Sequence, residues 1–123
     1  MAKKHSPRFL AIVNAARNEI EECDASDLPE LISDGAVLID VRERYEFEAG
    51  HHVDAIYIGK GVIERDIEKQ DFDLEQKIVL YCGGGFRSAI AAKSLADMGY
   101  SNVISLWGGW RGILAEGLET KSE

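Results

Sequence analysis

The chain contains 123 residues, 46% of them hydrophobic, and carries a formal net charge of −8. This length suits one domain with a single core, and the composition predicts a globular fold rather than disorder. The acidic balance argues against nucleic acid and anionic membrane surfaces as partners.

We expect no targeting signal. The basic residues at 1–8 are followed by an apolar run at 9–13 that is too short for a secretory signal, and no segment approaches the length of a membrane span. The two cysteines, Cys23 and Cys82, show neither a C-x-x-C nor a zinc-type spacing. A disulfide framework is therefore not expected, and a single reactive thiol suits a reducing compartment. These features favour a cytoplasmic protein.

A helix is expected over residues 7–22, after a tail at 1–6. Its apolar residues recur at spacings of four, three, four and three: Phe9, Val13, Ala16, Ile20 and Cys23. This stripe should pack on the body of the domain, with Cys23 as a small core residue. A second interpretation stays open, in which Cys23 is a resolving thiol for Cys82.

Residues 26–39 predict a short helix followed by the first buried strand. Ser26 has the side chain of an N-cap, and a helix should follow over 27–32. Asp34-Gly35 predicts a turn, after which the apolar run at 36–39 indicates a strand.

Polar residues follow this strand directly. Asp40 is suited to accept backbone N–H groups at a turn and Arg42 to bridge carbonyls or carboxylates, so we expect both to support the structure. A catalytic role for either residue is the alternative. His51 and His52 are adjacent on an extended segment and should point to opposite faces, so they are not expected to share a metal ion. We expect neither a metal nor a cofactor.

The second half of the chain alternates strands and helices. The expected elements are a strand at 55–58, a helix at 60–69, a polar connector at 71–76, a strand at 78–81, a helix at 88–98, a strand at 103–106, a Trp-Gly-Gly-Trp break at 107–110 and a helix at 111–118. This alternation predicts an α/β fold with a parallel sheet, of which four strands are visible in the sequence.

The stretch from 78 to 88 combines a strand, a cysteine, three glycines and the start of a helix. Cys82 lies at the carboxyl end of the strand, where open α/β sheets usually bind ligands. The glycines at 83–85 keep side chains away and allow several N–H groups to face the sulfur. These amides, the helix start and Arg87 favour the thiolate form of Cys82. The alternative is a buried, inert cysteine.

The pattern Cys82-x-x-Gly85-x-Arg87-Ser88 resembles the active-site loop of the rhodanese family of sulfurtransferases. Three earlier matches to the same family are Asp40-Val41-Arg42, Glu46-Phe47 and Gly50-His51. The resemblance implies a single rhodanese-like domain at about 26–118, with a parallel sheet of four to five strands flanked by helices. Residues 1–25 would form an N-terminal tail and an extra amphipathic helix packed on the domain, and residues 119–123 a C-terminal tail.

The resemblance also implies sulfur transfer through a covalent intermediate. Cys82 would take the outer sulfur of thiosulfate or of a persulfide and pass it to a thiol or another nucleophile. The substrate would be bound by the loop residues, namely Gly83, Gly84, Gly85, Phe86, Arg87 and Ser88, whose N–H groups would stabilise the terminal sulfur. Arg87 could orient the donor or brace the loop. Many thiosulfate users have a basic or polar residue in place of Gly83, so persulfide donors and a protein donor or acceptor stay open.

Two other functions stay open as well. Cysteine phosphatases use a Cys-x5-Arg loop, whereas Cys82 and Arg87 form Cys-x4-Arg, a smaller cup that suits one sulfur better than a phosphate. A phosphatase or arsenate reductase on the same fold is therefore the second alternative. The first alternative is a sulfur carrier or regulatory domain that docks a partner with little turnover. Trp107, Trp110 and the N-terminal helix could provide its docking surface.

Overall fold

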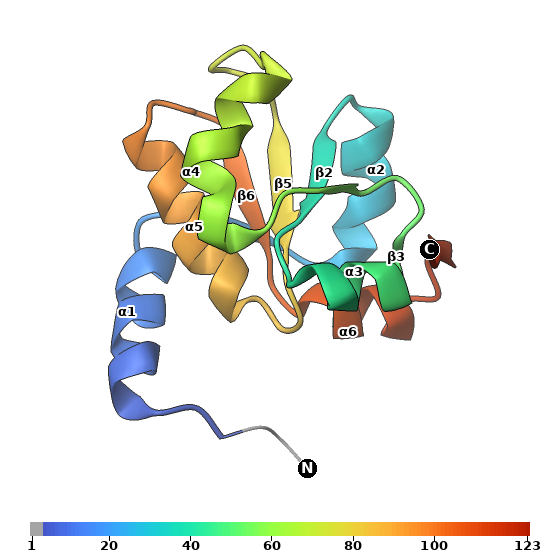
Figure 1. Ribbon diagram of the computed structural model, residues 1–123, viewed down its shortest axis with the longest axis horizontal. Coiled ribbons are helices and arrows are strands. Elements are labelled where there is room, and N and C mark those ends of the chain that lie inside the picture. Colours follow the sequence, from blue (N-terminus) through green and yellow to red (C-terminus); the bar gives the residue numbers. More distant parts are fainter. Residues whose placement is uncertain (1–3) are drawn as a thin grey trace.

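The computed structural model describes residues 4–123, so residues 1–3 of the expected N-terminal tail lie outside the described part (Figure 1). A five-stranded sheet runs through the centre in the order β1-β6-β5-β2-β4, and each neighbouring pair is parallel. Its strands are β1 (Glu21–Cys23), β2 (Val37–Asp40), β4 (Ile56–Tyr57), β5 (Ile78–Tyr81) and β6 (Val103–Leu106). The expected parallel α/β class is confirmed.

Helices cover both faces of this sheet (Figure 1). They are α1 (Pro7–Arg17), α2 (Leu28–Ser33), α3 (Arg44–Ala49), α4 (Ile63–Asp66), α5 (Phe86–Asp97) and α6 (Gly109–Ala115). Apolar side chains of α4 and α5 pack on one face of the sheet, and those of α2 and α6 pack on the other. α1 packs on α5, where Val13 and Ala16 meet Ala89.

The central strand β5 gives the clearest sequence signal because it is buried on both faces. Ile78 and Leu80 belong to the cluster under α4 and α5, whereas Val79 and Tyr81 belong to the cluster under α2 and α6. A strand with both faces covered has a continuous apolar run instead of an alternating pattern. The strand leads directly to Cys82, so its burial fixes the position of the thiol.

The segment after α1 forms strand β1, so the prediction of a helix over 7–22 was wrong beyond Arg17. The helix closes at Asn18, and β1 then pairs with β6, where Cys23 lies beside Leu106. The edge of β6 offers backbone partners that a longer helix would leave unpaired, and this pairing outweighs the helical spacing of the apolar residues. Cys23 is half-buried and packs against the cluster under α2 and α6.

The start of α2 also differs from the prediction. A 3₁₀ turn at Ala25–Asp27 precedes the helix, which begins at Leu28. The Asp27 carboxylate accepts the backbone N–H of Asp24 at 3.0 Å. Ser26 lies inside the 3₁₀ turn, so it is not the N-cap that the sequence predicted.

Three later helices have different bounds from those predicted. The helix expected at 60–69 is divided, because α4 lies between 3₁₀ turns at Lys60–Val62 and Ile67–Gln70. Helices α5 and α6 each begin two residues earlier than predicted. The glycine before each of them, Gly85 or Gly108, has a positive φ that turns the chain directly into the helix.

The C-terminal residues 119–123 include a short strand. Thr120–Lys121 (β7) pairs antiparallel with His51–His52 (β3), apart from the main sheet. Within residues 4–123, none of the helices combines the length and the apolar character that crossing a bilayer requires.

Candidate active site

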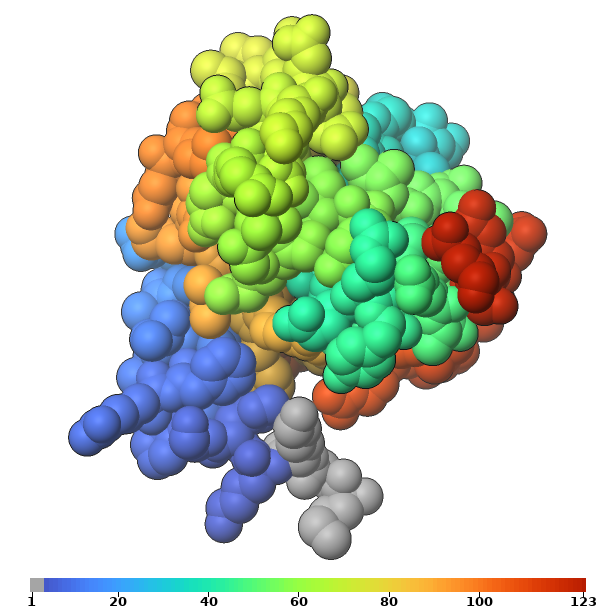
Figure 2. All heavy atoms as spheres, viewed as in Figure 1, coloured from blue at the N-terminus to red at the C-terminus, as the bar shows by residue number. Residues whose placement is uncertain are grey.

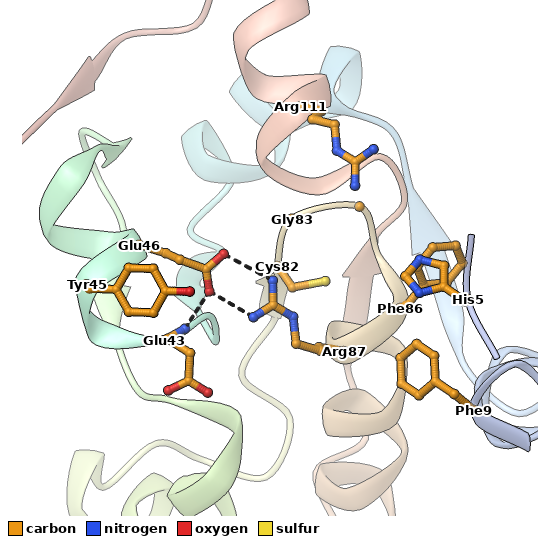
Figure 3. A pocket seen from close by; sticks show the side chains of 11 residues that line it. His5, Phe9, Glu43, Tyr45, Glu46, Cys82, Gly83, Phe86, Arg87 and Arg111 are labelled. Atoms are coloured by element: carbon orange, nitrogen blue, oxygen red, sulfur yellow. Dashed lines mark hydrogen bonds and ion pairs between the residues drawn. The ribbon is translucent and has the colours of Figure 1, made fainter. Parts of the chain in front are cut away.

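A cavity of about 330 Å³ opens beside the carboxyl end of β5 (Figure 3). Its walls come from four separate parts of the chain. They are His5 and Phe9 at the N-terminal segment, Glu43, Tyr45 and Glu46 at α3, the loop residues Cys82, Gly83, Gly84, Phe86 and Arg87, and Arg111 of α6. The N-terminal segment, blue in Figure 2, projects from the body of the domain beside the golden start of α5.

The turn between β6 and α6 fixes the shape of the cysteine loop. Three backbone N–H groups of this turn donate to loop carbonyls: Trp110 to Cys82 at 2.7 Å, Gly108 to Gly84 at 3.0 Å and Arg111 to Gly83 at 3.3 Å. These three hydrogen bonds hold the loop in the shape in which the N–H groups of Gly85 and Ser88 reach the Cys82 sulfur. The turn that contains Gly108 and Gly109 thus holds the cysteine loop in place, a role that the sequence alone did not reveal.

The Cys82 sulfur receives two backbone donors. The N–H of Gly85 lies 3.1 Å from Sγ, and the N–H of Ser88 lies 3.4 Å from it. The Ser88 hydroxyl is 3.6 Å from the same sulfur and forms a 2.8 Å hydrogen bond with the hydroxyl of Ser105. The two backbone N–H groups and the N-terminus of the 12-residue helix α5 therefore all lie on the side of the loop that holds the sulfur.

Arg87 is held by a carboxylate. Its Nη1 and Nη2 atoms donate to the two Glu46 carboxylate oxygens at 2.9 and 3.3 Å, which ties the cysteine loop to α3 (Figure 3). This hydrogen bond lowers the pKa of Glu46 and raises the pKa of Arg87. Of the two roles left open for Arg87, orienting the donor or bracing the loop, this geometry favours bracing.

Arg111 is a cation of the cavity that sequence reasoning missed. It is exposed, and its Nη2 would lie 3.1 Å from a Cβ added to Gly84, so the guanidinium lies over the cysteine loop. It forms no ion pair or side-chain hydrogen bond within residues 4–123. Only the packing of α6 beside the loop brings it to the site, and no sequence pattern indicated that.

Asp40 and Arg42 lie near the site but do not line the cavity. Arg42 donates to both Asp40 carboxylate oxygens, with Nη2 to Oδ2 at 2.7 Å, and its Nη2 also donates to the carbonyl of Gly50 at 2.6 Å. Both side chains are buried. The pair fixes the connection between β2 and α3, which carries the Glu46 carboxylate.

Neither histidine of β3 faces the cavity. The Nδ1 of His51 lies 2.6 Å from the carbonyl oxygen of Phe47, whose ring stacks on the imidazole. The His52 Nδ1 accepts the N–H of Asp54 at 3.0 Å. Across the described residues, no three histidine, cysteine or acidic side chains gather as metal ligands would.

Cys23 lies outside this cavity, on β1. Burial raises the pKa of the Cys23 thiol to about 12, and the nearby Asp27 and Asp24 carboxylates add to the shift. A thiol with this pKa remains protonated at neutral pH, so Cys23 is a weak nucleophile in this environment.

The family model of the rhodanese-like domain matches residues 24–116. Among curated proteins, a tRNA uridine(34) hydroxylase of Hamiltonella defensa is 34% identical over 90 residues, which are 69% of this chain and 25% of that protein. The chain spans about a quarter of the length of the curated relatives that it matches.

Two solved structures are similar over most of the chain. The polysulfide-sulfur transferase homodimer of Wolinella succinogenes has a TM-score of 0.81 at 28% identity, with 94% of this chain and 88% of that chain covered. A protein of unknown function from Rhodopseudomonas palustris, named a possible tyrosine phosphatase, has a TM-score of 0.80 at 27% identity, with 98% and 99% covered. The cysteine loop, the parallel sheet and the matched family model agree: the chain belongs to the rhodanese-like domain family.

Proposed function

We propose that this protein is a sulfurtransferase that carries a sulfane sulfur as a persulfide on Cys82. The observation that carries the proposal is the pair of backbone N–H groups, from Gly85 and Ser88, directed at Sγ beside an open cavity. Such donors favour the thiolate, which is the nucleophilic form of cysteine.

The reaction has two steps. The Cys82 thiolate attacks the outer sulfur of the donor, the S–S bond of the donor breaks, and its electron pair leaves with the remainder, which is sulfite when the donor is thiosulfate. The enzyme then holds Cys82–S–S⁻. A thiolate or cyanide attacks the terminal sulfur, takes it as a persulfide or as thiocyanate, and releases the Cys82 thiolate.

The cysteine loop can stabilise the terminal sulfur of this intermediate. The backbone N–H groups of Gly83, Gly84, Phe86 and Arg87 donate to no acceptor within residues 4–123. These amides are therefore available to a negative atom that extends beyond Sγ, as the terminal sulfur of a persulfide would. Gly83 and Gly84 have no side chain to fill that space.

A singly charged persulfide donor fits the charge of the cavity better than thiosulfate. Arg87 is neutralised by Glu46, which leaves one unpaired guanidinium, that of Arg111, among the described cavity residues. A doubly charged donor would gain from a second free cation. One similar structure is named a polysulfide-sulfur transferase, which supports a sulfane-sulfur donor other than thiosulfate.

A phosphatase is the second candidate, because another similar structure is named a possible tyrosine phosphatase. A phosphatase would need the loop arginine to bind phosphate oxygens, whereas Arg87 is engaged by Glu46 and the loop is one residue shorter than Cys-x5-Arg. We expect no hydrolysis of p-nitrophenyl phosphate. Hydrolysis that disappears in Cys82→Ser would favour the phosphatase.

The curated relatives are named tRNA uridine(34) hydroxylases, which raises tRNA as a partner that the acidic charge argued against. The match covers about a quarter of those proteins, so their whole activity does not transfer to this chain. With a net charge of −8, the chain offers little counterion release to an RNA backbone. We expect no gel shift of tRNA at about 100 mM salt. Specific binding of tRNA would contradict this expectation and make tRNA a candidate acceptor of the sulfur.

The sulfurtransferase proposal is tested by measuring thiocyanate formed from cyanide with thiosulfate, a low-molecular-weight persulfide or polysulfide as the donor. We expect multiple turnovers for the wild type and none for Cys82→Ser. A single equivalent of thiocyanate per protein, without turnover, would instead identify a sulfur carrier. Absence of any product that depends on Cys82 would overturn the proposal.

A further inference from the structure

Three aromatic rings form one wall of the cavity. His5 and Phe9 of the N-terminal segment lie against Phe86, with ring centroids 4.4 Å apart for His5 and Phe86 and 6.4 Å apart for Phe9 and Phe86. Figure 3 shows the three rings together on one side of the Cys82 sulfur, opposite Tyr45 and Glu46. We call these three residues the aromatic wall.

The aromatic wall depends on a helix outside the segment matched by the family model, which begins at residue 24. Val13 and Ala16 of α1 pack on Ala89 of α5, and Phe9 and Phe86 lie against the same cluster. This packing holds the N-terminal segment at the opening of the cavity. The N-terminal segment thus supplies two of the side chains that a ligand of Cys82 would meet: Phe9 from α1 and His5 from the residues just before it.

The remaining walls are polar. Arg111 lies over the cysteine loop without an ion-pair partner among the described residues, whereas the charge of Arg87 is balanced by Glu46. The cavity volume of about 330 Å³ falls in the range of roughly 300–1,000 Å³ that is typical of sites for small organic ligands. An inorganic anion such as thiosulfate would reach Arg111 and Cys82 and leave the aromatic wall unused.

We propose that the preferred donor is an organic sulfane-sulfur compound whose flat apolar body packs on the aromatic wall while its anionic group binds Arg111. This inference rests on the proposed sulfur transfer through Cys82. The outer sulfur then lies at the thiol, between the aromatic wall and the guanidinium. The N-terminal segment acts as the specificity element of the site.

Thiosulfonate anions provide the matched donors. Benzenethiosulfonate and methanethiosulfonate carry the same reacting –SO₂–S⁻ group and differ in the body attached to it. In either case the Cys82 thiolate bonds to the outer sulfur, the S–S bond of the donor breaks, and the electron pair leaves with the sulfinate. Charge is conserved in this step: the thiolate and the thiosulfonate each carry one negative charge before it, and the persulfide and the sulfinate each carry one after it.

The test compares kcat/KM for these two donors in the full chain. Phe9→Ala and His5→Ala should each lower kcat/KM for the phenyl donor by roughly three- to tenfold, the value of one aromatic contact, and leave the methyl donor nearly unchanged. Phe9→Leu keeps an apolar side chain for the packing of α1 but removes the ring, so it should still lose most of the preference for the phenyl donor over the methyl donor. Ile12→Ala, at an exposed position of the same helix, is the control and should change neither donor.

Arg111 is tested with the same donors. Arg111→Gln should raise KM for both donors to a similar degree, because both carry the anionic group, and Arg111→Lys should restore part of the loss. Equal effects of the Phe9 and His5 variants on the two donors would overturn the aromatic wall as a specificity element. In that case turnover that still depends on Cys82 would leave the proposed sulfur transfer intact, whereas no turnover with any donor would overturn both.

Discussion

Replacing Gly109 by alanine should damage both stability and sulfur transfer. A Cβ at this position would overlap the carbonyl oxygen of Cys82 and lie 2.9 Å from the backbone carbonyl of Gly83. Gly109 also has a φ of 50°, in the left-handed region that alanine enters at a cost. The substitution therefore pushes directly on the loop that holds the thiol.

Gly117→Ala is the matched control, because Gly117 has a φ of 73° and a Cβ added there would meet no other atom within 4 Å. The left-handed backbone costs alanine about 1 kcal/mol at either glycine. At Gly109 the overlap also disrupts the hydrogen bonds from Trp110 and Arg111 to the loop, each worth about 1 kcal/mol. We expect the free energy of unfolding to fall by about 1 kcal/mol in Gly117→Ala and by about 3 kcal/mol in Gly109→Ala.

Urea unfolding and thiocyanate formation measure the two effects. With a denaturant slope of about 2 kcal/mol/M, the unfolding midpoints of the two variants should differ by about 1 M. Turnover per folded molecule should fall at least about tenfold in Gly109→Ala, because the loop amides shift relative to the sulfur. It should stay near the wild-type value in Gly117→Ala. Equal midpoints, or full turnover from Gly109→Ala, would refute the idea that this turn shapes the cysteine loop.

Three further predictions follow from the ion pairs and from the second thiol. Glu46→Gln should cost about 1 kcal/mol at pH 7, because the charge on Arg87 loses its partly buried partner. Since the pKa of Glu46 is lowered from 4.5, the difference in unfolding free energy from the wild type should persist above pH 4.5 and disappear as the pH falls through the lowered value. Asp40→Asn should cost about 3 kcal/mol in chemical denaturation, because it leaves the Arg42 charge buried and unpaired. Cys23→Ser should retain sulfur transfer, and with a pKa of about 12 the Cys23 thiol of the wild type should react with iodoacetamide only slowly at pH 8, as peptide mapping would measure.

Each of these predictions has a contrary outcome. A stability difference for Glu46→Gln that does not diminish as the pH falls below 4.5 would exclude an ionic origin. Asp40→Asn with wild-type stability would mean that water or another group compensates Arg42. Loss of turnover in Cys23→Ser would revive the resolving role for that thiol.

The sequence predicted the parts of the fold whose signal is local. The strands at 78–81 and 103–106 are buried on both faces, so their apolar runs gave the observed bounds. The three consecutive glycines at 83–85 likewise gave a local signal, because they indicated a tight loop directly after Cys82. By contrast, β1 forms because the edge of β6 is available to it, and no pattern within 21–23 indicates that partner.

The cavity shows the same division. Cys82 and Arg87 were identified from one contiguous pattern, whereas Arg111 and the aromatic wall reach the site through the packing of α6 and α1. The partner of Arg87 is likewise 41 residues away, at Glu46. A contact over that distance depends on the assembled sheet, so the sequence left the role of Arg87 open.

The most direct measurement of the central claim is the intact mass of the protein after treatment with a sulfane-sulfur donor and removal of the excess. A persulfide on Cys82 predicts a gain of about 32 Da, one sulfur atom, that maps to the peptide of the cysteine loop and is released by cyanide. It should form in the wild type and in Cys23→Ser but not in Cys82→Ser. An unchanged mass with every donor, or an adduct on Cys23 alone, would contradict the account.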